Sequence, residues 1–279
     1  MSKWNLIVDV DNCTNCNACL LACSDEYYGN EFPGYAAEMP KHGHKWINIK
    51  QKVRGTAPEI DVAYLPVMCQ HCDNAPCIAA SENGAVSKRA DGIVIIDPEK
   101  AKGQKQLVEA CAYDAVYWND DKQLPQHWIF DAHLLDQGWK EPRAAQVCST
   151  QAIRAVKVDD AEMLKIAERE GLEHLHPEYE AKPRVWYKNL HQYTTSFVAG
   201  SVEAEKEGVI DCVEGAKVEL LQNEQSIAMT SSDNYGDFKF DRLEENSGKY
   251  QIKISGDGFD AKVIDIELGE STYLGAVSL

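Results

Sequence analysis

The hydrophobic pattern of the first 160 residues predicts short strands joined by long irregular segments. Residues 1–9 are typical of a short strand that leads into a cysteine-rich loop. Residues 24–62 form a long insertion rich in aromatic and turn-forming residues. Within it, 45–49 predict only an edge strand, because their alternation is weak. A turn at Asp91-Gly92 leads into short strands at 93–96.

A single amphipathic helix is predicted after this region, at residues 160–171. Asp159 or Asp160 is a suitable N-cap and Gly171 a suitable end. We expect Met163, Leu164 and 166–167 to form its core-facing side. The following segment, 172–190, is irregular and rich in Pro, His and Tyr, and we expect it to lie as a strap over the preceding domain or a partner.

The pattern changes near residue 197, where short alternating segments separated by Gly, Asp, Asn and Ser turns begin. Seven such segments predict a β-sandwich of roughly 80 residues, immunoglobulin-like or Cna-B-like, without catalytic residues. The expected strands are 197–202, 216–221, 226–231, 237–240, 250–254, 261–268 and 273–277. The predicted fold class is thus α+β, with a first domain at 1–158, a helix-and-strap linker at 159–196 and a sandwich at 197–279.

The composition narrows the classes of partner. The 45 acidic against 28 basic residues give a net charge of −17, which argues against nucleic acid or an anionic membrane surface. No apolar run reaches the length of a membrane span, so we expect no direct membrane insertion. Ten cysteines without a signal sequence favour metal ligation in a reducing compartment and a cytoplasmic location, although a partner could carry an export signal.

The strongest motif is the cysteine run Cys13, Cys16, Cys19 and Cys23. Its spacing, C-x2-C-x2-C-x3-C, is typical of a ferredoxin loop that binds a [4Fe-4S] cubane through its first three thiolates. Zinc sites usually use paired C-x2-C knuckles. Four cysteines this close in sequence could hardly form disulfides without strain. The run therefore predicts an iron–sulfur site.

Three further runs are incomplete copies of the first. Cys69, Cys72 and Cys77 have Ser81 where a fourth cysteine is expected. In the next run only Cys111 remains, because the other slots hold Ala101, Gln104 and Leu107. In the last run only Cys148 remains, and the other slots hold Trp128, Asp131 and Ala144.

The losses follow the ligand exchange of two-cluster ferredoxins, in which the fourth cysteine of one run ligates the cluster of its partner run. Cys111 can complete one site and Cys148 another, which predicts a double ferredoxin-like domain with two [4Fe-4S] clusters. Cluster one uses Cys13, Cys16, Cys19 and Cys148, and cluster two uses Cys69, Cys72, Cys77 and Cys111. The remaining slots form two reciprocal sites, one of Ala101, Gln104, Leu107 and Ser81 without a thiolate, and one of Cys23, Trp128, Asp131 and Ala144 with a single thiolate, which cannot hold a cubane.

Two cysteines remain outside these sets. We interpret Cys23 as an unligated buried thiol and expect Cys212 to be unligated and buried as well. Asp131 and His127 could offer oxygen and nitrogen ligands beside Cys23, but iron of such clusters strongly prefers thiolate. Two clusters are therefore expected rather than three.

The cysteine runs and several other segments resemble a known family over essentially all 279 positions. The chain resembles the iron–sulfur small subunits of molybdopterin oxidoreductases, the dimethyl-sulfoxide-reductase family, and within it the transhydroxylases of phenolic rings. The resemblance to the dimethyl-sulfoxide-reductase family lies in segments 13–23, 64–77, 92–100 and 132–136. The resemblance to the transhydroxylases lies in segments 46–49, 54–56, 182–190 and 214–218.

This resemblance implies a non-catalytic subunit of an anaerobic heterodimer whose large partner binds molybdopterin, with Mo or W, and acts on hydroxylated aromatic rings. Higher assembly of heterodimers stays open. Family members normally carry four cubanes as an electron wire. By the family's cluster order, the two clusters missing here would form the middle of that wire, which suits a redox-neutral transhydroxylation.

Two alternatives remain open for the function. One is an electron-transfer subunit of an anaerobic phenol-ring hydroxylase or dehydroxylase. The other is a structural scaffold whose clusters only brace the fold and the interface. No residue of this chain is predicted to be catalytic, so in each case we expect the active site in the partner.

Overall fold

The computed structural model describes all residues from 1 to 279. By their internal contacts, these residues form two compact units. The first contains Met1–Gln51 and Tyr64–Leu190, and the second contains Lys52–Ala63 and His191–Leu279. The two-stranded ribbon of β2 (Ile47–Thr56) and β3 (Glu59–Met68) therefore contributes its tip to the second unit. Only a short strand near 47 was expected here.

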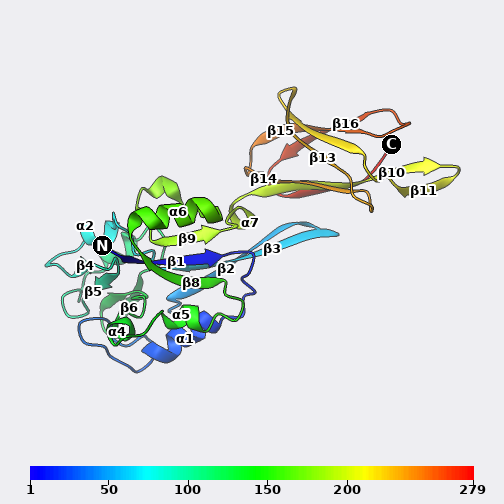
Figure 1. Cartoon of the computed structure of the whole chain (residues 1–279). Helices are drawn as coiled ribbons and strands as arrows, with labels where there is room; N and C mark the ends of the chain where they lie inside the picture. The colour runs from blue at the N-terminus through cyan, green and yellow to red at the C-terminus, as the bar shows by residue number, and fades with distance from the viewer. The chain divides into compact units, whose positions relative to one another are not determined.

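The first unit is built around β1 (Lys3–Asp9), the middle strand of a three-stranded sheet (Figure 1). It pairs antiparallel with β8 (Ile153–Val158) and parallel with β9 (Val185–Lys188). Residues 4–8 of β1 are all buried, as expected for a strand covered on both faces. The sheet thus brings the N-terminal strand beside segments from 153 and 185 onward.

Two small ribbons and several short helices complete the first unit. The ribbons pair β4 (Val86–Lys88) with β5 (Val94–Ile96), and β6 (Tyr117–Asn119) with β7 (Leu124–Gln126). The helices are α1 (Ala18–Tyr27), α2 (Pro76–Ala79), α3 (Gln106–Glu109), α4 (Ala132–Asp136) and α5 (Arg143–Gln146), with the 3-10 turn η1 (Pro177–Tyr179).

The predicted amphipathic helix is present as α6 (Asp160–Glu170). Asp159 caps it by accepting a hydrogen bond from the Glu162 N–H, and Gly171 ends it in the left-handed conformation. Met163, Ile166 and Ala167 pack against Ile7 of β1. The expectation for Leu164 was wrong, because this side chain is 62% exposed. Leu164 follows Met163 directly and lies outside the row of buried side chains formed by Met163, Ile166 and Ala167.

The second unit begins with the short helix α7 (His191–Thr194) and continues as two four-stranded sheets. One contains β10 (Ser196–Lys206), β11 (Val209–Cys212), β14 (Asp237–Leu243) and β17 (Thr272–Ser278), with β10 in contact with the other three. The other has the order β13 (Gln225–Ser231), β12 (Lys217–Gln222), β15 (Gly248–Ser255) and β16 (Lys262–Leu268).

One hydrophobic core joins the two sheets of the second unit. Val202 and Phe238 from the first sheet and Leu220 and Ile252 from the second are among its buried members. The sandwich has eight strands rather than the predicted seven, because β11 was missed. All four residues of β11 are exposed, so no buried face produced an alternating signal.

The exposure of β11 also corrects the expectation for Cys212. This cysteine is exposed rather than buried, because it ends a strand whose side chains all face solvent. Cys23, in contrast, is 2% exposed, as expected. None of the helices in the structure combines the length and the apolar character needed to cross a membrane.

Candidate metal centres

The first set of predicted ligands, Cys13, Cys16, Cys19 and Cys148, comes together where the loop after β1 meets helices α1 and α5. We call it group one. Cys19 lies in α1 and Cys148 follows α5, and the two helices pack against each other. Burial raises the pKa of the Cys19 thiol to about 12, and the neighbouring Cys13, Cys148 and Cys16 contribute to this rise. Cysteines from the two ends of the first domain are thus neighbours.

The second set, Cys69, Cys72, Cys77 and Cys111, is called group two. Burial raises the pKa of Cys72 to about 12 and that of Cys77 to about 11, and the thiol of Cys111 adds to both shifts. Cys69 is fully surrounded, and its pKa is raised first by burial and then by Cys111 and Cys77. The structure therefore brings together the same four thiols that ligand exchange predicts.

The two loops have the same backbone conformation at equivalent positions. Asn15, in the loop between Cys13 and Cys16, has φ 55°, and His71, at the matching place before Cys72, has φ 46°. Their backbone N–H groups lower the pKa of the Cys13 and Cys69 thiols, respectively. This left-handed turn aims amide protons at sulfur, the arrangement that stabilises thiolates bound to a cluster.

The fourth cysteines, Cys111 and Cys148, also receive amide hydrogen bonds. The Ala115 N–H donates to Cys111 Sγ, and the Ile153 N–H donates to Cys148 Sγ, each at 3.4 Å. All ten cysteines of the chain are free rather than paired in disulfides. Two sets of four soft thiol ligands with amide donors fit [4Fe-4S] cubanes.

The side chains do not fit a single metal ion. No group of three or more His, Cys, Asp or Glu side chains converges on one ion-sized position. A zinc site needs four ligands around one ion, whereas a cubane spreads four thiolates around a much larger body. The preference for a cubane over zinc rests on the spacing of the cysteines.

The reciprocal site beside group two is filled by the protein itself. Ala101 and Leu107 are fully buried in a hydrophobic cluster that packs against Cys77 and Cys111. The Gln104 side chain bridges the backbone, accepting from the Glu82 N–H at 2.9 Å and donating to the Lys100 carbonyl at 2.8 Å. Apolar packing and one amide therefore occupy the three slots of this run that lack a cysteine.

The reciprocal site beside group one is filled by a buried carboxyl network. Asp131, 1% exposed, accepts from the Tyr27 hydroxyl at 2.7 Å, from Trp128 Nε1 at 3.3 Å and from the Arg143 N–H at 2.8 Å. Burial is the main cause that raises the pKa of Asp131, and these hydrogen bonds oppose it. The neighbouring Cys23 thiol has its pKa raised by burial and then by Asp131.

The two residues considered as further ligands beside Cys23, Asp131 and His127, differ in their hydrogen bonding. Both oxygens of Asp131 already accept hydrogen bonds from the protein. His127 is 3% exposed, and neither of its ring nitrogens has a hydrogen-bond partner. Burial lowers the pKa of His127 to about 4.

The contacts also show which neighbours each reciprocal site has. The reciprocal site that contains Cys23, Trp128 and Asp131 has neighbours in both groups. The ring centroids of Trp128 and of His71 in the group-two loop lie 6.0 Å apart, and Cys23 lies near Cys19 of group one. In the other reciprocal site, Ala101 and Leu107 belong to the hydrophobic cluster that packs against Cys77 and Cys111 of group two. The order of the clusters stays a prediction; the contacts place the Trp128 ring near the group-two loop and Cys23 near group one.

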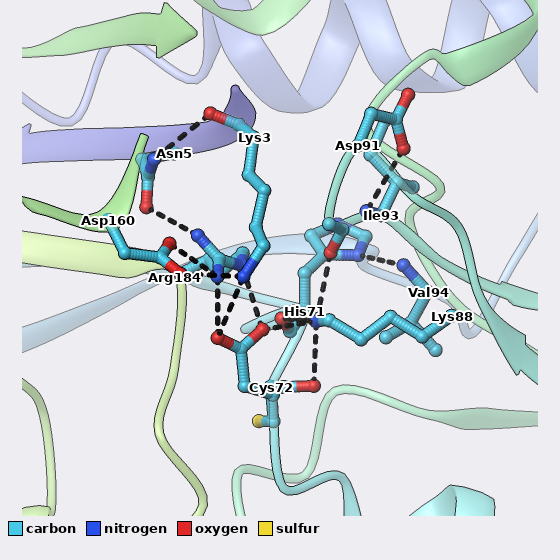
Figure 2. Close-up of polar contacts among 12 residues, drawn as sticks. Lys3, Asn5, His71, Cys72, Lys88, Asp91, Ile93, Val94, Asp160 and Arg184 are labelled. Atoms are coloured by element: carbon cyan, nitrogen blue, oxygen red, sulfur yellow. Dashed lines mark hydrogen bonds and ion pairs between the residues drawn. The ribbon is translucent and has the colours of Figure 1, made fainter. Parts of the chain in front are cut away.

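The sequence reasoning missed a charged clamp behind group two, formed by Lys88, Asp73 and Arg184 (Figure 2). Arg184 Nε donates to Asp73 Oδ1 at 2.8 Å, and Lys88 pairs with the same oxygen at 2.8 Å. Gly92 allows this approach, because a Cβ there would lie 2.9 Å from the Arg184 side chain. Asp73 and Arg184 are 111 positions apart, so no local pattern connects them.

The strap at 172–190 holds the same loop through its backbone. The Asp73 N–H donates to the Lys182 carbonyl at 2.8 Å, and the Arg184 N–H donates to the Gln70 carbonyl at 2.8 Å. The expectation that this segment lies over the first domain is thus confirmed. It explains how a segment beyond the cysteine runs positions them.

Comparisons with known proteins agree with this class of site. Residues 60–158 match the family described as "4Fe-4S dicluster domain". The whole chain is 42% identical to the "Pyrogallol hydroxytransferase small subunit" of Pelobacter acidigallici, covering 100% of both chains. It is 27% identical to the iron–sulfur subunit of the arsenate respiratory reductase of Shewanella sp., over 50% of this chain and 55% of that one. The beta subunit of dimethylsulfide dehydrogenase of Rhodovulum sulfidophilum is 33% identical, over 53% and 46%.

The fold and the thiol groups define an iron–sulfur protein of the ferredoxin type. The chain belongs to the family of iron–sulfur small subunits of the molybdopterin oxidoreductases, the dimethyl-sulfoxide-reductase family, together with the small subunit of pyrogallol hydroxytransferase. This confirms the family resemblance derived from the cysteine runs.

Solved structures do not identify the type of the second unit. Shaft pilin SpaA from Lactobacillus rhamnosus GG, for example, is 14% identical over 35% of this chain and 48% of that chain, with a TM-score of 0.27. The immunoglobulin-like or Cna-B-like type therefore stays a prediction.

Proposed function

We propose that the chain is the non-catalytic small subunit of a heterodimer that transfers hydroxyl groups on hydroxylated aromatic rings, and that it binds two [4Fe-4S] clusters. Cluster one is held by Cys13, Cys16, Cys19 and Cys148, and cluster two by Cys69, Cys72, Cys77 and Cys111. When bound, such clusters store and pass single electrons. Here they act over a short range or brace the fold.

The observation that carries this proposal is the gathering of four thiols into each of two groups, while protein side chains fill the two reciprocal sites. Each group supplies the full ligand set of one cubane, including amide donors at the fourth cysteine. Cys23 and Cys212 stay outside, one beside Asp131 and the other on an exposed strand.

The partner follows from the family. Its members are small subunits of larger enzymes, so a large catalytic subunit is implied. We infer that this partner binds molybdopterin, with Mo or W, and contains the active site. The likeness at 42% identity to a subunit named for pyrogallol supports a phenolic substrate. Ten free cysteines support a reducing, cytoplasmic location.

The proposal also keeps the predicted division of the chain into a first domain at 1–158, a linker at 159–196 and a sandwich at 197–279.

The test is the iron and acid-labile sulfide content of the complex, purified without oxygen. We expect about eight of each per small subunit, as two cubanes require. Cys111→Ser and Cys148→Ser should each lower both to about four. The matched control Cys212→Ser, on the exposed strand β11, should keep about eight. A value near twelve for the unmodified protein, or a loss of iron in Cys23→Ser, contradicts the proposal.

A second candidate, the electron-transfer subunit of a phenol-ring hydroxylase or dehydroxylase, is favoured by one observation. The Trp128 and Asp131 side chains make continuous contacts from the group-two loop to Cys23 beside group one. Rapid mixing with a reductant separates the candidates. Reduction of both clusters as fast as turnover favours electron transfer, whereas reduction far slower than turnover favours the redox-neutral or bracing role.

A further inference from the structure

We propose that Lys88, held by Asp73 and Arg184, raises the reduction potential of cluster two and so sets it apart from cluster one. The inference rests on the proposed function, since it takes group two as a cluster site. Three features support it: the contacts of the ammonium group, the direction of the loop amides, and the absence of an equivalent cation in the group-one loop.

Lys88 ends β4, and its ammonium lies directly behind the Cys69–Cys72 loop (Figure 2). Its Nζ donates to the carbonyl oxygens of His71 at 2.8 Å, Cys72 at 2.9 Å and Gly92 at 3.0 Å, and it pairs with Asp73 Oδ1 at 2.8 Å. All four partners are acceptors. An ammonium group has only donors, so the charged form of lysine fits this position.

The backbone of the loop lies between the ammonium and the sulfur atoms. A trans peptide points its carbonyl and the following N–H in opposite directions. Because the His71 carbonyl faces Lys88, the Cys72 N–H faces the other side of the loop, where this N–H lowers the pKa of the Cys72 thiol. Lys88 thus holds the amide dipole between His71 and Cys72 with its positive end toward a ligand.

The charges around Lys88 do not cancel its effect. Three cations (Lys3, Lys88, Arg184) and two carboxylates (Asp73, Asp160) form the surrounding network. The side chains of Lys88 and Arg184 are 20% and 6% exposed, whereas Asp73 and Asp160 are 32% and 57% exposed. Water screens the carboxylates more strongly, so the network presents a net positive field to the thiols.

The equivalent position in the group-one loop carries no such charge. Asn15 has the place of His71, and its carbonyl accepts a hydrogen bond from the neutral side-chain amide of Asn17 at 2.8 Å. The same carbonyl in the two loops is therefore held by a cation in one case and by an amide in the other. This difference sets the two sites apart.

The effect on potential follows from charge. One-electron reduction adds one negative charge to a cluster and its four thiolates, and a cation on the far side of the loop stabilises that added charge. Cluster two is then easier to reduce than it would be without Lys88. Electrons would collect at cluster two when both clusters are exposed to the same donor.

The test is a redox titration of the complex with its partner subunit, with dithionite as the reductant and electron paramagnetic resonance as the readout. In Lys88→Met we expect one cluster to shift to lower potential by a tenfold change in its reduced-to-oxidised ratio, about 59 mV for one electron. The other cluster should keep its potential. Lys88→Arg should retain the unmodified value. The control Lys102→Met removes an equal charge from a lysine that is 55% exposed, and should shift neither.

A second variant covers the case in which Lys88→Met fails to assemble. Asp73→Asn removes the countercharge and should shift the same cluster to higher potential. Unchanged potentials in a variant that retains both clusters, or equal shifts of both clusters, overturn the inference. If the unmodified complex lacks a second cluster signal, the proposed function itself fails, and the two failures are thus distinguished.

Discussion

At the scale of single residues, buried polar side chains stand at slots where the incomplete cysteine runs lack a cysteine. Asp131 replaces a ligand but stays buried because Tyr27, Trp128 and the Arg143 backbone donate to it. Gln104 does the same for the other site by bridging backbone groups. In each case a polar side chain at a slot without cysteine is held by hydrogen bonds from or to the protein.

His127, beside the Asp131 network, predicts a dependence of stability on pH. Its folded pKa of about 4 lies below the ordinary 6.5, so the folded protein keeps the ring neutral while the unfolded chain binds a proton. Stability should therefore fall as the pH drops below 6.5, by about 1.5 kcal/mol between pH 6.5 and 5. Anaerobic urea unfolding, followed by tryptophan fluorescence, measures this.

The variant His127→Phe isolates the contribution of this ring. It should remove the part of the pH dependence between pH 6.5 and 5 that His127 contributes, and it removes the two unpartnered nitrogens of this ring from the interior. Burial also lowers the pKa of His71, so the contribution of that ring should remain. His42→Phe is the control, because His42 is exposed. An unchanged slope in His127→Phe would show that other groups cause the dependence.

At the scale of elements, the tip of the β2–β3 ribbon depends on one glycine. Gly55 has φ +77°, and a Cβ there would lie 2.4 Å from the Glu59 carbonyl oxygen and 2.5 Å from the Phe197 ring. Both neighbours belong to the second unit, as does the tip. Close contact and a left-handed backbone thus coincide at this position.

Gly55→Ala should therefore destabilise the second unit by more than the roughly 1 kcal/mol expected from backbone conformation alone. Gly208→Ala is a matched control, since Gly208 has φ +82° but no atom within 4 Å of the added Cβ. The measurement is the urea midpoint of each variant. Equal losses in both would mean that the contacts at the ribbon tip relax without cost.

At the scale of the whole molecule, the two thiol groups gather cysteines from distant parts of the first unit, while the second unit has its own core. Group one joins Cys13 to Cys148, and group two joins Cys69 to Cys111. The second unit is held by a hydrophobic cluster with buried residues from both of its sheets. The structural need for iron should therefore be confined to the first unit.

Removal of iron with a chelator and a mild oxidant should open the first unit to proteolysis and leave the strands after residue 196 resistant. This follows because binding energy of a cluster is folding energy for the segments it joins. Mass spectrometry of a timed digest identifies the resistant fragment, with the untreated complex as the control. Cleavage within β12 or β15 as early as near α1 would contradict the division of stability.

The sequence by itself predicted the two groups of four thiols that the structure brings together, because the spacing of the cysteine runs and the pattern of their losses are local, countable features. It also determined α6, whose cap and periodicity lie within a dozen residues, and most strands of the sandwich. Only the tertiary structure decided what fills the replaced sites and where the Lys88 clamp lies. Those contacts join Asp73 to Arg184 and Tyr27 to Asp131, over 111 and 104 positions, and no local pattern encodes such partners. For the same reason β11 was missed, since a strand with no buried residue leaves no hydrophobic pattern.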